Sequence, residues 1–383
     1  MSDTQKHNKP NVPNLRFPEF SGEWKIFSLG DLCSEFQSGK GIKANSIKEN
    51  APYPVYGGNG LRGYSDFYNH DGDYSLIGRQ GAKCGNVRLV SGRSYITEHA
   101  IAIKANSKNN TEFLTWLLVQ MNLGQYSDQS AQPGLAVNKL VKLKAFVPDL
   151  NEQTKIARLL TLLNNRIVVQ NKVIEDLITL EKVLINSSFR DIKGENIPLS
   201  VIAQRIVDRN ANCGCSNVLT ISAKDGLVSQ LNYFKKSVAS QNISNYYLLQ
   251  KGDFAYNKSY STDYPWGAVK HLENYNQGIL SPLYFCFRAN SRVVNIDYLQ
   301  LFFDTDIWYK HISEIAVEGA RNHGLLNMSV SDFMAMPILL PSLVEQNKIV
   351  NNLMYFRKKK QSEIQYLMAL EKQKKYLLSQ MFI

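Results

Sequence analysis

A stretch of 42 residues occurs twice in this chain and constrains its fold more than any other feature. Residues 148–189 and 341–382 align without a gap and agree at 11 of 42 positions, seven of them among the first 13. Average composition would give roughly two or three matches. The chain therefore contains a duplicated element. The alternative, two unrelated surface helices, leaves the shared Glu-Gln-x-Lys-Ile start and the matched length unexplained.

Each copy predicts one long helix. It opens with a proline after a strand-like run, continues with Glu-Gln, and contains no internal Pro or Gly. At 1.5 Å per residue, a helix of about 39 residues is about 58 Å long, several times an ordinary globular helix. Such a helix needs a partner along its length, and the nearest partner is the other copy.

Apolar residues alternate at spacings of four and three, which is typical of a coiled-coil seam. In the first copy the seam consists of Ile156, Leu160, Leu163, Ile167, Ile174, Leu177 and Leu184, with Gln170 and Glu181 as polar interruptions. In the second copy it consists of Ile349, Leu353, Phe356, Leu367, Leu370 and Leu377, with Lys360, Glu363 and Lys374 at positions that require apolar residues. Two registers remain open: the ungapped one, and a three-residue shift that aligns the two Leu-Glu-Lys sequences.

The charge of the chain favours a polyanionic partner. Its formal net charge is +11 over 383 residues, and the last 43 residues contain eight Lys and Arg against three Glu. The alternative is a basic protein that is merely soluble.

The cysteine count and the hydropathy pattern indicate a reducing compartment. The five cysteines are an odd number without regular spacing, and Cys213-Gly214-Cys215 is too close a pair for a zinc knuckle, so we expect neither disulfides nor a metal site. The first dozen residues are polar, and no apolar run reaches transmembrane length. We therefore expect a cytoplasmic protein without a membrane partner.

The repeats divide the chain into four parts and predict an α+β fold. Residues 1–147 form a polar tail and a first globular domain, 148–190 the first long helix, 191–340 a second globular domain, and 341–383 the second long helix. Both domains combine short β-rich runs, glycine-rich turns and one helix, near 112–121 and near 296–305. Gly72-Asp73-Tyr74 and Gly252-Asp253-Phe254 occupy similar places in the two domains.

Catalytic motifs are not recognisable. The segments GGNG and GRQGAKCG contain glycines but match neither a P-loop nor a dinucleotide-binding fingerprint, so we interpret both as turns. We find no H-E-x-x-H or G-x-S-x-G motif and no carboxylate cluster typical of nucleases. The sequence predicts no catalytic residue.

The glycine-rich loops instead carry polar and aromatic side chains suited to reading DNA. Arg and Lys pair with guanine, Asn and Gln pair with adenine, and the other side chains can hold phosphates. The predicted DNA-binding residues are Asn59, Arg62, Tyr64, Arg79, Gln80, Lys83 and Asn86 in the first domain, and Asn257, Lys258, Tyr260, Arg321, Asn322 and His323 in the second. The alternative for each of them is solvent exposure without contact.

Over essentially the whole chain, this arrangement resembles the specificity subunit of type I restriction-modification systems. The resemblance rests on the LRFPEF opening followed by LGDL, on AQPGLAVNKL and VPDLNEQTKI with its partner PSLVEQNKI, on the ending LEKQKKYLLSQMF, and on the tandem order. It implies two target-recognition domains that each read half of a bipartite DNA site. It also implies that the long helices pack antiparallel, in a pseudo-twofold tandem repeat, as a coiled-coil spacer.

The resemblance further implies a noncatalytic chain that binds double-stranded DNA and works with other subunits. Two methyltransferase subunits would dock on the chain, and restriction subunits would complete the complex. S-adenosylmethionine, ATP and Mg²⁺ would serve those partners, with no cofactor in this chain. Two alternatives from other classes are a single-chain nucleic-acid methyltransferase and a coiled-coil scaffold without a DNA role.

Overall fold

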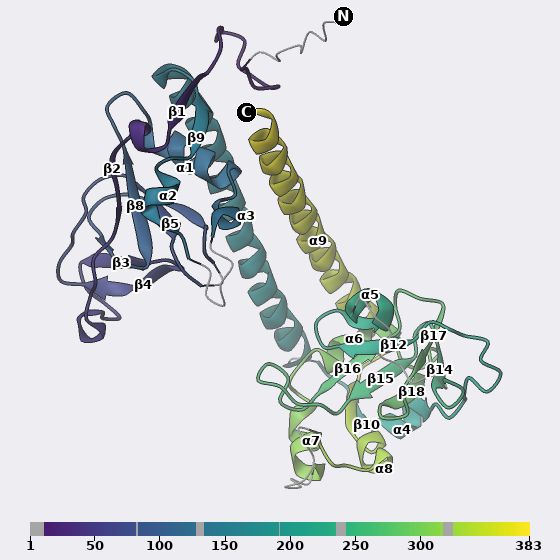
Figure 1. Ribbon diagram of the computed structural model, residues 1–383. Helices are drawn as coiled ribbons and strands as arrows, with labels where there is room; N and C mark the ends of the chain where they lie inside the picture. Colours follow the sequence, from purple (N-terminus) through teal and green to yellow (C-terminus); the bar gives the residue numbers. More distant parts are fainter. Residues whose placement is uncertain (1–10, 82, 128–133, 191, 235–242, 317–324) are drawn as a thin grey trace, which may run out of the picture. The chain divides into compact units, whose positions relative to one another are not determined.

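Two long helices organise the fold. The computed structural model describes residues 11–81, 83–127, 134–190, 192–234, 243–316 and 325–383. Helix α3 spans Leu150–Arg190 and helix α9 spans Leu343–Gln380. The chain divides into two compact units, one of Met1–Lys172 with Ile364–Ile383 and one of Val173–Glu363. Each unit therefore combines one β-rich domain with half of α3 and half of α9 (Figure 1).

The first domain is built on a four-stranded antiparallel sheet in the order β2-β8-β5-β6. Its strands are β2 (Cys33–Ser38), β8 (Ala100–Ala105), β5 (Tyr74–Gly78) and β6 (Val87–Val90). A smaller sheet contains β4 (Gly60–Ser65), β3 (Tyr53–Gly57) and β7 (Tyr95–Ile96), and a two-stranded ribbon contains β1 (Lys25–Ser28) and β9 (Lys144–Val147). The helices are α1 (Thr111–Gln120), α2 (Val137–Leu140) and the 3-10 turns η1 (Gly30–Leu32), η2 (Ala44–Ser46) and η3 (Leu123–Tyr126).

The second domain repeats this plan around the sheet β11-β18-β15-β16. Its strands are β11 (Ala203–Arg205), β18 (Phe285–Ala289), β15 (Phe254–Asn257) and β16 (Ala268–His271), and its ribbon pairs β10 (Glu195–Pro198) with β19 (Pro337–Leu340). Two further pairs are β12 (Leu219–Ser222) with β13 (Gly226–Ser229), and β14 (Tyr247–Gln250) with β17 (Gln277–Leu280). The helices are α4 (Leu199–Ile202), α5 (Gln230–Phe234), α6 (Ile296–Phe303), α7 (Tyr309–Ile315) and α8 (Val330–Met334).

The duplication therefore extends through both domains, and the predicted α+β class is confirmed. Both central sheets have the same strand order, and both ribbons precede a long helix. The domains differ in the segments between the first and second strands of the central sheet in chain order. There the first domain has β3 and β4 of its three-stranded sheet, whereas the second has β12, β13 and β14 of its two-stranded pairs. The shared frame thus carries unlike insertions.

The Glu-Gln start of each long helix ties that helix to its domain. Gln153 in α3 and Gln346 in α9 are almost fully buried. The side-chain oxygen of Gln153 accepts a hydrogen bond from the backbone N–H of Asn110, the N-cap of α1, at 2.9 Å. Gln346 makes the same contact with the N–H of Asn295, the N-cap of α6, at 2.8 Å. Each glutamine thus joins two helix starts, which explains why this residue type recurs.

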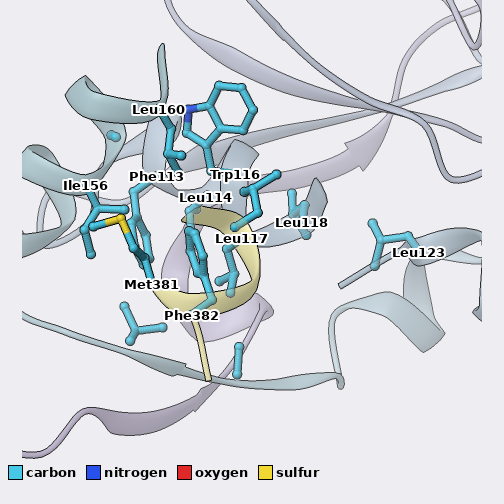
Figure 2. Close-up of a cluster of buried hydrophobic side chains, with 14 of the residues drawn as sticks. Phe113, Leu114, Trp116, Leu117, Leu118, Leu123, Ile156, Leu160, Met381 and Phe382 are labelled. Atoms are coloured by element: carbon cyan, nitrogen blue, oxygen red, sulfur yellow. The ribbon is translucent and has the colours of Figure 1, made fainter. Parts of the chain in front are cut away.

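The end of the opposite long helix closes each domain core. In the first unit, Phe382 follows α9 and stacks on Phe113 of α1, with ring centroids 5.5 Å apart, among side chains of α1 and α3 (Figure 2). In the second unit, the repeat-equivalent residue of α3, Phe189, packs on Tyr298 of α6 at 5.2 Å. Each domain is therefore packed against the start of one long helix and the end of the other.

One register accounts for the polar pairs between the helices in both units. In the first unit, Lys374 donates to the Asn164 side chain at 2.7 Å. The repeat offset of 193 residues converts Asn164 into Arg357 and Lys374 into Glu181, and these two residues pair at 2.8 Å in the second unit. The same offset relates Gln153 to Gln346 at the helix starts and Phe189 to Phe382 at the helix ends, so the structure follows the ungapped alignment. In each unit the helix halves run antiparallel.

The predicted seam residues lie along these contacts. Ile156, Leu160, Leu163, Ile167, Leu353, Leu370 and Leu377 are buried, and Ile174, Leu177, Leu184, Ile349, Phe356 and Leu367 are half-buried. Although α3 and α9 are long, no helix in the described part of the chain is apolar enough to cross a membrane.

Candidate nucleic-acid interface

The two glycine-rich loops of the first domain meet at Gly78, the last residue of β5. A Cβ atom at Gly78 would lie 2.6 Å from the carbonyl oxygen of Gly58 and 2.7 Å from that of Lys83, so only glycine permits this approach. The backbone N–H of Arg79 donates to the carbonyl of His99 at 3.0 Å. The segments GGNG and GRQGAKCG, which lie about 20 residues apart in sequence, therefore form one loop cluster.

The predicted DNA-binding residues of the first domain project from this cluster and from the adjoining strand β4. Asn59, Arg62, Gln80, Lys83 and Asn86 are exposed, whereas Tyr64 and Arg79 are half-buried. The Arg79 guanidinium donates to the Ser38 hydroxyl at 3.3 Å, so part of its hydrogen-bonding capacity is already used. The other donors and acceptors are placed to meet a ligand from solvent.

Basic residues that the sequence analysis missed join the same cluster. Gly39 packs closely on the backbone of Ile96 and Thr97. The exposed Lys40 therefore lies beside the glycine-rich loop cluster. Arg88 is exposed, and its guanidinium lies so close to Gly60 that a Cβ atom added there would be 3.0 Å from it. The pattern Gly-Lys-Gly-Ile-Lys at 39–43 is a signal that could have drawn attention to Lys40. Arg88 lies on a strand and gives no such signal.

In the second domain the predicted residues follow β15, which ends at Asn257. The Asn257 side chain accepts a hydrogen bond from the backbone N–H of Ser259 at 3.0 Å. The Lys258 ammonium lies 4.6 Å from the centroid of the Phe285 ring, and Tyr260 is 58% exposed. Asn257 therefore shapes the turn, Lys258 packs on an aromatic ring, and Tyr260 is the most available of the three. Arg321, Asn322 and His323 lie outside the described residues.

The candidate loops occupy equivalent places in the two domains. After β5, Gln80 pairs with Gly134 in the segment that precedes α2. After β15, Ser259 pairs with Leu325 in the segment that precedes α8. In the sequence, Leu325 directly follows EGARNHG, which lies outside the described residues. The same frame thus presents two loop clusters of different composition.

The described residues offer little for catalysis or metal binding. No group of three His, Cys, Asp or Glu side chains among them is arranged to hold a metal ion. Burial raises the pKa of the Cys33 and Cys286 thiols to about 12, which makes both poor nucleophiles. Cys215 is buried in a turn whose backbone binds the Asn210 side chain, and Cys213 is exposed.

Comparison with known proteins agrees with this geometry. A family model described as the type I restriction modification DNA specificity domain matches residues 21–179, the first domain and most of α3. The first domain and most of α3 are therefore similar to this domain family. The fold of this chain matches a type I restriction-modification S subunit from M. genitalium with a TM-score of 0.63 and 15% identity, over 97% of this chain and 99% of that one.

Sequence relatives cover only part of the chain. The EcoprrI type I restriction enzyme specificity subunit of Escherichia coli is 45% identical over 150 residues, which are 38% of this chain and 37% of that subunit. A type I restriction enzyme specificity subunit of Haemophilus influenzae is 24% identical over 36% of each chain. The matched segments thus span little more than a third of either relative. A second structure, from work on the assembly of the type I R-M system, has a TM-score of 0.52 at 12% identity, over 93% of this chain and 96% of that one.

Proposed function

We propose that this chain is the subunit that selects the DNA sequence for a type I restriction-modification complex. Each β-rich domain reads one half of an asymmetric, bipartite site in double-stranded DNA. The observation that carries the proposal is the pair of unlike loop clusters held at equivalent places on a duplicated frame. A repeated frame gives one docking geometry, and different side chains on it give two different base sequences.

The chain supplies binding and no chemistry in this proposal. Methyl transfer and cleavage belong to partner subunits, which use S-adenosylmethionine, ATP and Mg²⁺. The net charge of +11 supports phosphate contacts that hold the DNA in place. The alternative of a single-chain methyltransferase predicts methyl transfer by the purified chain, and we expect none. The alternative of a scaffold without a DNA role predicts no salt-dependent binding to duplex DNA.

An exposed stripe on each long helix supports docking of partner helices. On α3 it consists of Leu162, Val169, Val173, Leu180 and Val183, whose spacings of 7, 4, 7 and 3 place them on one face. On α9 the residues equivalent to Leu162, Val173 and Val183 are Tyr355, Tyr366 and Tyr376, which are also exposed. Apolar and aromatic residues repeated on an exposed helix face are typical of a protein-binding surface. We assign these stripes to two copies of the methyltransferase subunit.

The test is a methylation map of DNA modified by this chain together with its partner methyltransferase. We expect methylation at a single bipartite sequence with two unlike halves and an unread spacer. Replacing residues 197–340 by the corresponding segment of another specificity subunit should change one half of the sequence and preserve the other. Methylation without sequence preference, or a change in both halves, would contradict the proposal.

A further inference from the structure

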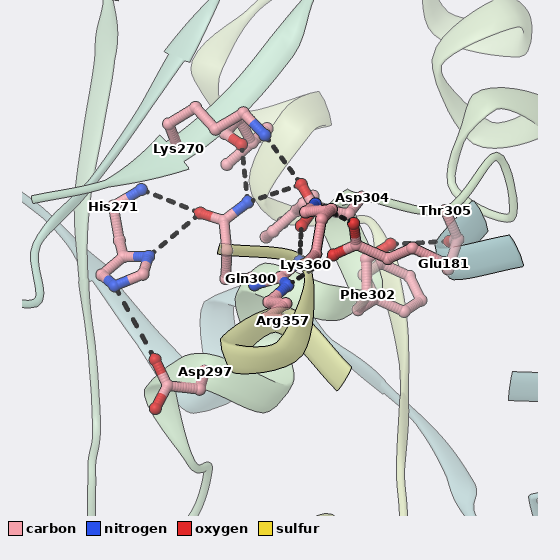
Figure 3. Close-up of polar contacts among 12 residues, drawn as sticks. Glu181, Lys270, His271, Asp297, Gln300, Phe302, Asp304, Thr305, Arg357 and Lys360 are labelled. Atoms are coloured by element: carbon pink, nitrogen blue, oxygen red, sulfur yellow. Dashed lines mark hydrogen bonds and ion pairs between the residues drawn. The ribbon is translucent and has the colours of Figure 1, made fainter. Parts of the chain in front are cut away.

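A chain of part-buried polar contacts links both long helices to strand β16, which directly follows the candidate DNA-reading loop after β15 (Figure 3). The Glu181 carboxylate of α3 accepts hydrogen bonds from Arg357 at 2.8 Å and from Lys360, both on α9. Arg357 also donates to Asp304, the C-cap of α6, at 2.9 Å. One guanidinium therefore joins α3, α9 and α6.

From α6 the contacts continue into the central sheet. The other carboxylate oxygen of Asp304 accepts from Lys270 of β16 at 2.7 Å and from Gln300 at 3.0 Å. The Gln300 side chain also binds the backbone of Val269 and of His271, on either side of Lys270. Strand β16 is thus held at three successive residues. It begins directly after the segment YNKSYSTDYPWG, whose first residues include the predicted DNA contacts.

This network differs from the apolar packing around it in one physical respect. The contact of Phe189 with Tyr298 stabilises the packing of α3 on α6. It does not fix the angle between the two helices, because the hydrophobic effect is non-directional. Charge-assisted hydrogen bonds, especially those of a guanidinium with two carboxylates, fix both distance and orientation. Asp304 remains charged: burial would raise its pKa, but Lys270 and Arg357 hold the pKa below its ordinary value.

The first unit has no counterpart of this network at the equivalent positions. Asn164 replaces Arg357, Ile167 replaces Lys360 and Lys374 replaces Glu181 at the repeat offset of 193. Lys374 there donates to Asn164 and lies 5.0 Å from the centroid of the Trp116 ring. Two carboxylates bridged by one guanidinium therefore characterise the second unit, although the shared fold does not require them.

We propose that Glu181, Arg357 and Asp304 are positioning residues for DNA recognition, which fix the orientation of the second reading loop on the helix pair. The inference rests on the proposed function. Its consequence is that these residues, which contact no DNA, determine how strictly the complex demands one spacer length between the two half-sites. If the network is broken, mainly apolar contacts hold the second domain on the two long helices, and its orientation on them can vary. The complex then also binds sites whose spacer is one base pair too long or too short.

The experiment compares Arg357→Gln with Arg288→Gln in the complete chain bound to its methyltransferase partner. Arg288 is the matched control, because it donates to the buried carboxylate of Asp253 at 2.6 and 2.7 Å but joins only elements inside the second domain. Both substitutions exchange an arginine that binds a carboxylate for a glutamine. After Arg357→Gln, Glu181 keeps Lys360 and Asp304 keeps Lys270, so the variant is not expected to be less stable than the control. Binding is measured on DNA sites that keep both half-sites and vary the spacer by one base pair in either direction.

For Arg357→Gln we expect the preference for the optimal spacer to fall by about 10-fold, roughly the effect of one base-pair mismatch, with both half-site sequences unchanged. Arg288→Gln should keep the wild-type preference, and Arg357→Lys should restore part of it. Equal spacer preference in Arg357→Gln, Arg288→Gln and the wild type would overturn the inference. If Arg357→Gln does not fold, Lys270→Gln at the outer end of the network replaces it with the same expectation. A wild-type complex without a spacer preference would overturn the proposed function, and the inference with it.

Discussion

At the scale of single residues, the clearest constraint is the buried carboxylate of Glu152 near the start of α3. Arg16 binds it through two nitrogens, at 2.8 and 2.7 Å, and also donates to the carbonyls of Ser21 and Gly22. The equivalent residue in α9, Glu345, is exposed and caps its own helix through Ser342. The same residue type therefore anchors the N-terminal segment in one copy and only caps a helix in the other.

We expect Arg16→Ala to destabilise the first unit by about 3–5 kcal/mol, because the change leaves the buried Glu152 carboxylate without its partner. Urea unfolding followed by tryptophan fluorescence measures this free energy, since Trp24 is in the core of that unit. Glu345→Gln is the control and should change the stability little. A loss below about 1 kcal/mol, the value of an exposed ion pair, would show that water reaches this site.

A second expectation at this scale concerns acid stability. The folded-state pKa of Asp304 is depressed by Lys270 and Arg357, although burial opposes this shift. The carboxylate therefore contributes stability above its unfolded pKa of about 3.9, and the contribution is lost as the pH falls through the lower folded value. Urea midpoints of the wild type and Asp304→Asn should differ at pH 7 and converge towards pH 3. A difference in urea midpoint that stays the same at all pH values would mean that the charge of Asp304 does not contribute to stability.

Residue-level roles were only partly predictable from sequence. The repeated Glu-Gln indicated a helix start, but the hydrogen bonds of Gln153 and Gln346 to the next helix cap depend on packing between distant segments. The polar loop residues were recognisable by type. The contact of Lys258 with Phe285 arises from the pairing of β15 with β18, and the position of Arg88 beside Gly60 arises from the approach of two separate sheets. Whether any of these side chains contacts a base stays a prediction.

At the scale of elements, polar residues that interrupt the apolar seam form hydrogen bonds between the two long helices in each unit. Glu181 and Lys374 occupy equivalent sites with opposite charge, and each has a partner across the helix pair in its own unit. Apolar periodicity alone left two registers open, because leucines satisfy either one. The matched contacts of Gln153 and Gln346 at the helix starts, and of Phe189 and Phe382 at the helix ends, select the ungapped alignment.

The proposed spacer role of the helices makes a prediction at this scale. Insertion of about four residues near Asn171, close to one helical turn, should lengthen the preferred DNA spacer by one or two base pairs. Both half-site sequences should persist, because the reading loops lie on the domains and not on the helices. Methylation of a library with variable spacers measures both properties. If the half-site sequence changed and the spacer length did not, the assignment of the domains as readers and the helices as spacer would be wrong.

At the scale of the whole molecule, the duplication predicts the stoichiometry of assembly. The exposed stripes of α3 and α9 lie at repeat-equivalent positions, and equivalent surfaces recruit equal partners. We expect two methyltransferase subunits per chain at saturation, measured by mass photometry. Tyr366→Glu on α9 should remove one of them, whereas Val173→Glu on α3 should remove the other. A saturated complex with one methyltransferase subunit would contradict the symmetry argument.

The late residues of α9 that close the first core have a consequence for synthesis of the protein in the cell. Trp24 and Phe382 lie with ring centroids 6.4 Å apart, and Leu370, Leu377 and Met381 belong to the same core as Ile156 of α3. A ribosome that adds 5–20 residues per second needs about 10 to 40 s to travel from the first half of α3 to Phe382. During that time the apolar side chains of α1 lack the α9 residues that cover them in the complete fold. The domain that is translated first is therefore the last to be completed, and its apolar core stays incomplete for longer than that of the second domain.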